Sequence, residues 1–280
     1  MTLSSVDAHC IGIHALNTRG IIVDMKVQEE IASKKPAWDD ENLASNPHDV
    51  EDKAARVEAM FTSIARKYDL NNRLHSLWQD QIWRQHAVEL ANIAENDVVF
   101  DIACGTGDLA MAFSRTGVRS VKGIDFTQAM LDIAVHKASV ANLPITYSQG
   151  DAMALDLPDC SADVVSIAFG IRNVQEPGKA LAEFHRILKP GGRLVILEFS
   201  TPKNAIIRVL NTFYTNRVMP ITATLIAQDT SGAYKYLPKS VASFSDAKTL
   251  AEEVSKIGFQ SVEQFSQTFG VCTITRGVKK

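Results

Sequence analysis

The chain has 280 residues, and 46% of them are hydrophobic, which is enough for one sizeable α/β domain with a short extension. Its formal net charge of -3 gives no reason to expect nucleic acid or a strongly anionic membrane surface as a partner. The cysteines have no metal-ligand spacing, which indicates a reducing, cytoplasmic location without disulfides or a metal site. They are Cys10, Cys104, Cys160 and Cys272.

Residues 1–48 show no sustained helical or strand period, and they lack the layout of a secretory signal. We therefore expect an extension without stable structure over this range. An alternative hypothesis takes Met25 as the first translated residue, which would make the residues before it a misassigned reading frame.

From Asp49 the pattern becomes helical, with apolar residues at steps of three and four. These residues are Val57, Met60, Phe61, Ile64, Ala65 and Tyr68. After a polar and aromatic stretch, helical spacing resumes from Ile82 to Ile93. We predict a helical cap over residues 49–95 that covers a substrate; an ordinary packing helix is the alternative.

The stretch from Val98 to Asp125 carries the clearest functional pattern. An apolar run of strand length stops at Gly105 and Gly107, and a helical pattern starts directly after them. Glycine permits the tight turn and lets a ligand lie against bare backbone, while the helix start presents unpaired N–H groups. Asp125 ends the next apolar run, about twenty residues beyond Gly105, where a carboxylate can accept hydrogen bonds from both hydroxyls of a ribose. This pattern predicts a nucleoside pocket.

The glycines alone leave two cofactors open, because Gly-Thr-Gly-Asp-Leu-Ala also satisfies the loose fingerprint of NAD-binding proteins. Asp101 favours S-adenosylmethionine (SAM). It stands four residues before Gly105, and Asp-x-x-x-Gly-x-Gly resembles motif I of class I SAM methyltransferases. In that family the acid helps to hold the loop and approaches the methionine end of SAM.

Strands and helices alternate through the middle of the chain, which predicts a parallel sheet with both faces covered. We predict strands at Val98–Ala103, Ser120–Ile124, Ile145–Gln149, Val164–Phe169 and Arg193–Phe199. Helices are expected near Asp108–Ser114, Gln128–Ala138 and Gly178–Leu188. Two runs around Gly270 predict a closing antiparallel hairpin. The predicted fold over residues 49–280 is therefore a Rossmann-like, seven-stranded α/β sheet with one antiparallel strand, as in class I SAM methyltransferases.

Four stretches carry a more specific resemblance. They are Lys67-Tyr68-Asp69 with Asn72, Ser76 and Trp83; Asp101–Asp108; Phe169-Gly170-Ile171-Arg172-Asn173-Val174; and Arg186–Arg193 with Leu197–Ser200. The Phe-Gly-Ile-Arg-Asn-Val block is characteristic of one family and rare elsewhere. On these motifs, residues 49–277 resemble the C-methyltransferases of ubiquinone and menaquinone biosynthesis.

Two features depart from that family's pattern. The motif around Tyr68 usually continues with glycine and a histidine-arginine pair before the tryptophan, but Trp78, Asp80 and Gln81 take those places here. The serine that commonly precedes Phe-Gly is Ala168, so a backbone contact to the cofactor can survive there but a side-chain contact cannot.

The resemblance implies transfer of a methyl group from SAM to a ring carbon of a polyprenyl hydroquinone, with demethylmenaquinol to menaquinol as the first choice. It leaves open whether the ring is a naphthoquinol or a benzoquinol. Two alternatives from other classes are a nicotinamide-dependent oxidoreductase and a non-catalytic SAM-fold scaffold in a quinone-synthesis assembly.

On the cofactor side, the resemblance places Thr106 and the backbone around it beside the methionine portion of SAM. Asp125 is expected at the ribose. Asp151 and Ala152, after the third predicted strand, resemble the pair that meets the adenine, with the acid accepting from the exocyclic amine.

On the substrate side, Arg172 follows the fourth predicted strand, and ligands of open α/β sheets bind at the carboxyl ends of their strands. We assign it phenolate stabilisation, with a structural salt bridge to Asp101 or Glu198 as the alternative. Tyr68 and His75 are further catalytic candidates, and the identity of the base is left open. Asn72, Asp229, Tyr234 and Tyr236 are weaker candidates for the same side of the pocket.

An apolar helical insertion is predicted over residues 204–240. Its apolar residues are Ile206, Val209, Leu210, Phe213, Val218 and Met219. They could wall a tunnel for an isoprenoid tail or contact the inner face of a membrane peripherally, while core packing or a homodimer contact are the alternatives.

Overall fold

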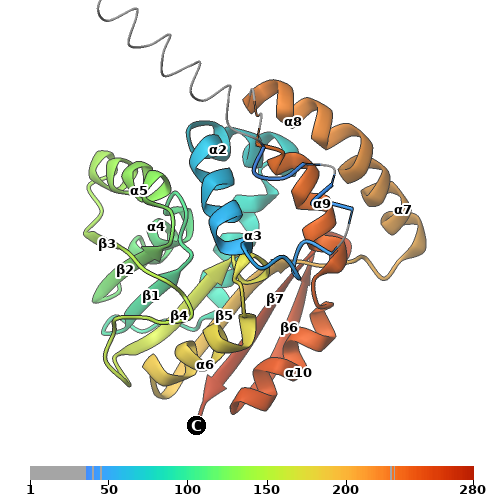
Figure 1. The fold of residues 1–280 in the computed structure, drawn as a ribbon. Helices are drawn as coiled ribbons and strands as arrows, with labels where there is room; N and C mark the ends of the chain where they lie inside the picture. Colours follow the sequence, from blue (N-terminus) through green and yellow to red (C-terminus); the bar gives the residue numbers. More distant parts are fainter. Residues whose placement is uncertain (1–35, 40, 45, 228, 230) are drawn as a thin grey trace, which may run out of the picture. The chain divides into compact units, whose positions relative to one another are not determined.

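The computed structural model describes residues 36–280 except 40, 45, 228 and 230. The expectations for residues 1–35, including the alternative start at Met25, lie outside the described residues. Within the described part, a seven-stranded sheet has the strand order β3-β2-β1-β4-β5-β7-β6 (Figure 1). The strands are β1 Val98–Ile102, β2 Ser120–Asp125, β3 Ile145–Gln149, β4 Ala162–Ala168, β5 Leu188–Phe199, β6 Phe259–Gln267 and β7 Cys272–Lys279.

The sheet is parallel from β3 to β5, and β7 runs antiparallel to both β5 and β6. This arrangement confirms the predicted fold class, including the closing hairpin. Side chains along β5 alternate between two cores, since Leu194 and Ile196 pack on one face while Val195 and Leu197 pack on the other. Strands that are buried on both faces require helices on both faces.

Helices α6 (Pro177–Ile187) and α10 (Ala247–Ile257) cover the first face of the sheet. Helices α3 (Gln79–Leu90) and α4 (Asp108–Ser114) cover the second. Helix α5 (Gln128–Val140) follows β2 and contacts β3. The predicted helix starts at Asp108 and Gln128 are confirmed.

A third core joins the predicted cap to the predicted insertion. Helix α2 (Lys53–Ser76) contributes Met60 and Ile64, which pack with residues of α8 (Met219–Ala227) and α9 (Ala233–Ser243). Helix α7 (Ala205–Phe213) and a π-helix (Tyr214–Val218) complete the insertion. The helix before β1 and the helices between β5 and β6 therefore build one helical layer beside the sheet (Figure 1).

Packed residues also occur before Asp49, where we expected the extension to continue. Trp38 and Leu43 are fully buried in the third core. The Trp38 indole stacks on the Tyr236 ring with centroids 4.4 Å apart. The backbone N–H of Trp38 donates to the Ser231 carbonyl at 2.9 Å. The described residues of 36–48 are thus part of the folded unit, which differs from the boundary that we expected at Asp49.

Strand order explains where a ligand can bind. The chain reverses its direction of winding between β1 and β4, which are hydrogen-bonded neighbours in the sheet. Loops that leave these two strands diverge to opposite faces and open a crevice at their carboxyl ends. The loop after Ile102 and the turn after Ala168 therefore meet at one edge of the sheet, beneath the helical layer.

Candidate active site

The glycine loop after β1 is a left-handed turn into α4. Ala103, Gly105 and Gly107 all have positive φ, of 51°, 54° and 82°. At Gly107 a Cβ atom would lie 2.5 Å from the Tyr147 hydroxyl, so glycine is needed there for close packing on β3. Gly105 lines the cavities that the loop borders, but Gly107 does not line these cavities. The structure thus gives Gly107, which we expected at the cofactor, a packing role.

Asp125 ends β2 beside this loop and accepts two backbone hydrogen bonds. The Gly105 N–H donates to one carboxylate oxygen at 2.7 Å, and the Thr127 N–H donates to the other at 2.8 Å. Burial raises the pKa of Asp125, and these two donors oppose the rise. Since each carboxylate oxygen has two lone pairs, the side chain can still accept from ribose hydroxyls while it holds the loop.

Asp101 lies in β1 and is almost completely buried, with 1% of its surface exposed. The Ser166 hydroxyl donates to its Oδ1 at 2.7 Å, while its Oδ2 has no partner in the described part of the chain. Burial raises the pKa of Asp101 to about 7. An unpartnered, buried carboxylate oxygen is a site for a cationic donor, and the α-ammonium of SAM has the required charge.

The space for a nucleoside lies between the strand ends and the cap. Its cavity has a volume of about 110 Å³ and contains Gly105, Asp125 and Ala168 in its wall. Asp151 and Ala152, which follow β3, line the same cavity, and the Asp151 Oδ1 accepts the Met153 N–H at 2.8 Å. A smaller adjoining cavity contains Asp101 and Thr106. The predicted cofactor residues other than Gly107 therefore line two neighbouring cavities, which share Gly105 and Ala168 in their walls.

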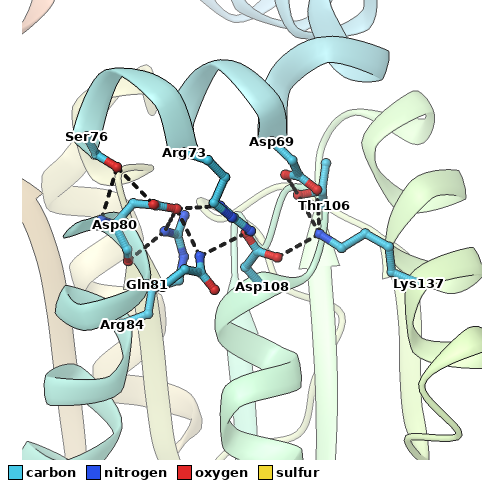
Figure 2. A network of polar contacts seen from close by, with 9 residues as sticks. All are labelled: Asp69, Arg73, Ser76, Asp80, Gln81, Arg84, Thr106, Asp108 and Lys137. Carbon is cyan, nitrogen blue, oxygen red and sulfur yellow. Dashed lines mark hydrogen bonds and ion pairs between the residues drawn. The ribbon is translucent and has the colours of Figure 1, made fainter. Parts of the chain in front are cut away.

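A charged network ties the cap to the glycine loop (Figure 2). It comprises Asp69, Arg73, Ser76, Asp80, Gln81, Arg84, Thr106, Asp108 and Lys137. In it, three carboxylates face three cations. The Lys137 ammonium donates to Asp69 and to Asp108 at 2.6 Å each, and the Thr106 hydroxyl donates to Asp69 at 2.6 Å.

The network decides what Thr106 can do. We expected Thr106 and the backbone around it beside the methionine portion of SAM. Its hydroxyl points to the cap helix and donates to Asp69, so this donor is already used. The Arg73 guanidinium bridges Asp80 at 2.5 Å and Asp108 at 2.7 Å. Burial by itself would raise the pKa of Asp108, but the charges of Arg84, Lys137 and Arg73 hold it well below its usual range. The loop and the cap are therefore held together by ionised groups.

The network also accounts for the departures from the family pattern. Asp80, at the histidine position, accepts from both Arg73 and Arg84, while Gln81, at the arginine position, donates to Asp80 at 2.9 Å. Trp78 stands where the family has glycine, and it retains a left-handed backbone with φ of 62°. The replacements thus preserve the turn between α2 and α3 and add a carboxylate that pairs with arginines.

A second cavity, of about 150 Å³, lies between the cap, the strand ends and the insertion. An engineered cavity of about this volume holds one benzene molecule, so the space suits one aromatic ring. Tyr68 and Phe169 line both this cavity and the nucleoside cavity. Burial raises the pKa of the Tyr68 phenol, which keeps it protonated at the junction.

Arg172 lines the ring-sized cavity and is paired with Glu198. Its Nη1 donates to the Glu198 carboxylate at 2.5 Å and to the Phe169 carbonyl at 2.7 Å. This is the salt bridge that we considered as the alternative role, with Glu198 rather than Asp101. The Arg172 Nε–H is buried and has no partner among the described residues. Arg172 therefore combines a structural ion pair with a buried Nε–H donor that has no partner among the described residues.

His75 lines the same cavity and contacts a residue that sequence reasoning missed. Its Nδ1 lies 2.8 Å from the Tyr214 hydroxyl, and that hydroxyl donates to the His75 carbonyl oxygen at 3.3 Å. The tautomer decides the roles of the ring nitrogens: when the hydroxyl donates to the carbonyl oxygen, Nδ1–H donates to the hydroxyl and Nε2 keeps its lone pair. Nε2 is buried without a partner in the described structure, and desolvation lowers the pKa of His75. The imidazole is neutral at pH 7.

The weaker candidates divide into two groups. Asn72, Tyr234 and Tyr236 line the ring-sized cavity. Asp229 does not line it, since its carboxylate accepts the backbone N–H groups of Ser231 and Ala233 and so forms the turn before α9. Tyr214 and Arg84 are the residues that we missed. A tyrosine in the apolar run 206–226 was the available signal for Tyr214, and no signal marked Arg84.

Residues 49–279 match the model of the ubiE/COQ5 methyltransferase family. A ubiquinone/menaquinone biosynthesis C-methyltransferase UbiE of Geobacter sulfurreducens is 41% identical over 234 residues, which are 81% of this chain and 90% of that protein. A demethylmenaquinone methyltransferase of Thermus thermophilus is 43% identical over 219 residues, which are 78% of this chain and 99% of that protein.

The fold also resembles solved structures of low sequence identity. A SAM-dependent methyltransferase of Thermotoga maritima, described as a possible histamine N-methyltransferase, superposes with a TM-score of 0.57 at 20% identity, covering 80% of this chain and all of that one. The [4+2]-cyclase SpnF superposes with a TM-score of 0.59 at 16% identity, covering 81% and 96%. None of these comparisons supports a nicotinamide-dependent oxidoreductase or a scaffold. The chain belongs to the ubiE/COQ5 methyltransferase family and is a SAM-dependent methyltransferase.

Proposed function

We propose that this enzyme transfers a methyl group from SAM to a ring carbon of a polyprenyl hydroquinone, with demethylmenaquinol as the preferred acceptor. The observation that carries methyl transfer to a ring is the ring-sized cavity that meets the nucleoside cavity at Tyr68 and Phe169, whereas the preference for demethylmenaquinol rests on the relative from Thermus thermophilus. The relatives from Geobacter sulfurreducens and Thermus thermophilus are named for quinone methylation, which supports the same substrate class.

On the cofactor side, Asp125 accepts from the ribose hydroxyls while its two backbone donors hold Gly105 in place. Asp101 receives the α-ammonium at its free Oδ2. Asp151 and Ala152 border the adenine, and Ala168 contributes its backbone. Bound SAM supplies a methyl group that is already strongly electrophilic, so the protein's task is alignment, which can contribute roughly 7–11 kcal/mol.

On the substrate side, the free Arg172 Nε–H donates to the oxygen of the ring and stabilises it as negative charge develops. Since Glu198 neutralises the guanidinium, we assign Arg172 a directional hydrogen bond rather than a bare positive charge. His75 accepts the hydroxyl proton at Nε2, where no partner competes in the described residues. After the ring carbon attacks the methyl group and the bond from methyl to sulfur breaks, that carbon loses its own proton to water and the ring oxygen regains the proton held by His75. Tyr68 separates the two spaces and limits the ring to one orientation.

The test offers purified enzyme radiolabelled SAM together with demethylmenaquinol and a methoxy-benzoquinol, side by side in reducing buffer. We expect label in the menaquinol product. Label in the benzoquinol alone would change the ring class and leave the reaction standing. SAM binding by calorimetry without label in either lipid would contradict the proposed function.

The proposal includes a cytoplasmic enzyme in peripheral contact with the inner face of a membrane, because a polyprenyl tail partitions into bilayers. Within the described residues, no helix is long and apolar enough to cross a membrane. We expect no nucleic-acid partner, and a homodimer stays a prediction.

A further inference from the structure

The segment from α7 to α8 exposes a continuous apolar stripe. Its side chains recur at three- and four-residue spacings on either side of a five-residue step from Phe213 to Val218, and between 37% and 73% of each is exposed. The stripe consists of Ile206, Val209, Leu210, Phe213, Val218, Ile221 and Leu225. No side chain of α7 is buried, and α7 stands away from the sheet in Figure 1. The stripe runs for about 28 Å along the helices, which is more than isolated surface residues explain.

The charge of this segment differs from that of the whole chain. Residues 203–227 carry three cations, Lys203, Arg208 and Arg217, and no acidic residue. All three cations are exposed. The chain's net charge of -3 therefore conceals a local excess of positive charge in the segment that carries the apolar stripe. An amphipathic helix with basic residues and without acids is typical of helices that lie in a membrane interface.

The opposite side of the same segment forms the wall of the ring-sized cavity. The residues that line that cavity are Asn211, Tyr214, Thr215 and Met219. None of the stripe residues lines it, and all of them are exposed to solvent. A lipid-soluble substrate that leaves a bilayer at the stripe would thus reach the cavity past one layer of helix. This step of the reasoning rests on the proposed function, but the exposed stripe and its charge do not.

We propose that the α7–α8 stripe docks the enzyme on an anionic bilayer surface, with both helices lying in the interface plane. A second copy of this chain fits less well. A two-fold interface would bring the same surface from both subunits together, so the cations would meet cations without any acid from residues 203–227. Anionic headgroups neutralise these cations.

The test measures cosedimentation of the full chain with phosphatidylcholine vesicles, with and without phosphatidylglycerol. We expect binding to the anionic vesicles that weakens with salt, and binding that is about tenfold weaker to phosphatidylcholine alone. The variant L210E/I221E should lose about tenfold or more of the vesicle affinity, since two charges on the stripe oppose insertion. V140E is the matched control, because Val140 is 70% exposed on α5.

The outcomes are distinct. Methylation of a short-chain, water-soluble quinol by L210E/I221E should stay within about twofold, because neither residue lines the cavity. If the wild type does not methylate the water-soluble quinol, the proposed function is contradicted. The vesicle-binding result still tests the docking proposal by itself. Wild-type protein that sediments with neither vesicle, or equal loss of binding in V140E, would overturn the docking proposal. A dimer in sedimentation equilibrium that L210E/I221E separates would assign the stripe to a second copy instead.

Discussion

The cofactor side and the substrate side of this active site are built in different ways. Apart from Ala168, the proposed cofactor contacts come from one stretch of sequence, 101–152, at the ends of adjacent parallel strands. The substrate side takes its residues from α2, α3, the ends of β4 and β5, the π-helix and α9. The first is a property of a local motif, and the second exists only when distant helices pack together.

The two sides also differ in how their polar atoms are satisfied. Around the glycine loop, Asp125, Thr106 and Asp108 all have hydrogen-bond partners, while Asp101 Oδ2 and the Tyr147 hydroxyl have none among the described residues. The substrate cavity holds three unpartnered buried atoms in the described chain. They are Asn71 Oδ1, His75 Nε2 and Arg172 Nε. Unsatisfied buried groups are costly, so their concentration there indicates the place where a polar ligand completes the structure.

The largest effect that separates the two sides is expected at Arg172. Removing its donor should lower kcat by about 100-fold and leave the Kd for SAM within about threefold, because it stabilises charge only as the reaction proceeds. Arg172→Ala would leave buried Glu198 unpaired at a cost of about 3–5 kcal/mol, so the measurement uses the paired variant R172M/E198Q. E198Q alone is the control. A tenfold weaker SAM affinity in the pair would place Arg172 on the cofactor side.

A smaller effect, confined to the cofactor side, is expected from Asp101. Because its pKa is raised to about 7, the SAM-free protein must lose a proton to bind an ammonium group below that pH. The Kd for SAM should therefore rise by nearly tenfold per unit as pH falls below 7, and Asp101→Asn should bind about 10–100-fold more weakly without this pH dependence. Calorimetry at several pH values checks both.

The same raised pKa has a consequence for stability. A carboxyl that is harder to ionise in the folded state lowers the free energy of unfolding as pH rises from about 4 to 7, by up to roughly 4 kcal/mol. Asp101→Asn should remove this loss. In urea unfolding without SAM, the free energies of unfolding of the variant and the wild type should therefore differ more at pH 8 than at pH 4. Equal differences at both pH values would contradict the assignment.

The smallest effect is expected from Tyr214. Tyr214→Phe removes the hydroxyl that orients His75, so kcat/KM for the quinol should fall by about three- to tenfold while SAM affinity stays unchanged. Since the pKa of His75 is lowered, the wild-type rate should be constant near pH 7 and fall in acid, below the ordinary histidine value of 6.5. With SAM saturating at every pH, so that protonation of Asp101 does not limit the rate, His75→Gln should abolish that acid limb. A retained limb would exclude His75 as the base.

Local sequence predicted the sheet, the glycine loop and the acid after β2, because these features depend on residues near each other in the chain. The strand at Ile145–Gln149 and the helix at Asp108–Ser114 agree with their predicted bounds. Gly107 shows where local reasoning stops, since its contact with Tyr147 involves a strand that lies forty residues further on. A glycine motif indicates that another group packs closely against the backbone, but it does not identify that group as a ligand or as a side chain of the protein.

The pairing of His75 with Tyr214 could not be predicted, because 139 residues separate them and no periodicity encodes their contact. The partner of Arg172 was one of two acids that sequence left open, and register alone did not separate them. The charged network is similar, since Asp69, Asp108 and Lys137 come from three elements whose meeting depends on how α2 packs over the sheet. The alternation of strands and helices and the glycine loop follow from short-range chemistry. Which side chains share a cavity depends on long-range packing, in which burial and desolvation select among partners that the linear sequence leaves equivalent.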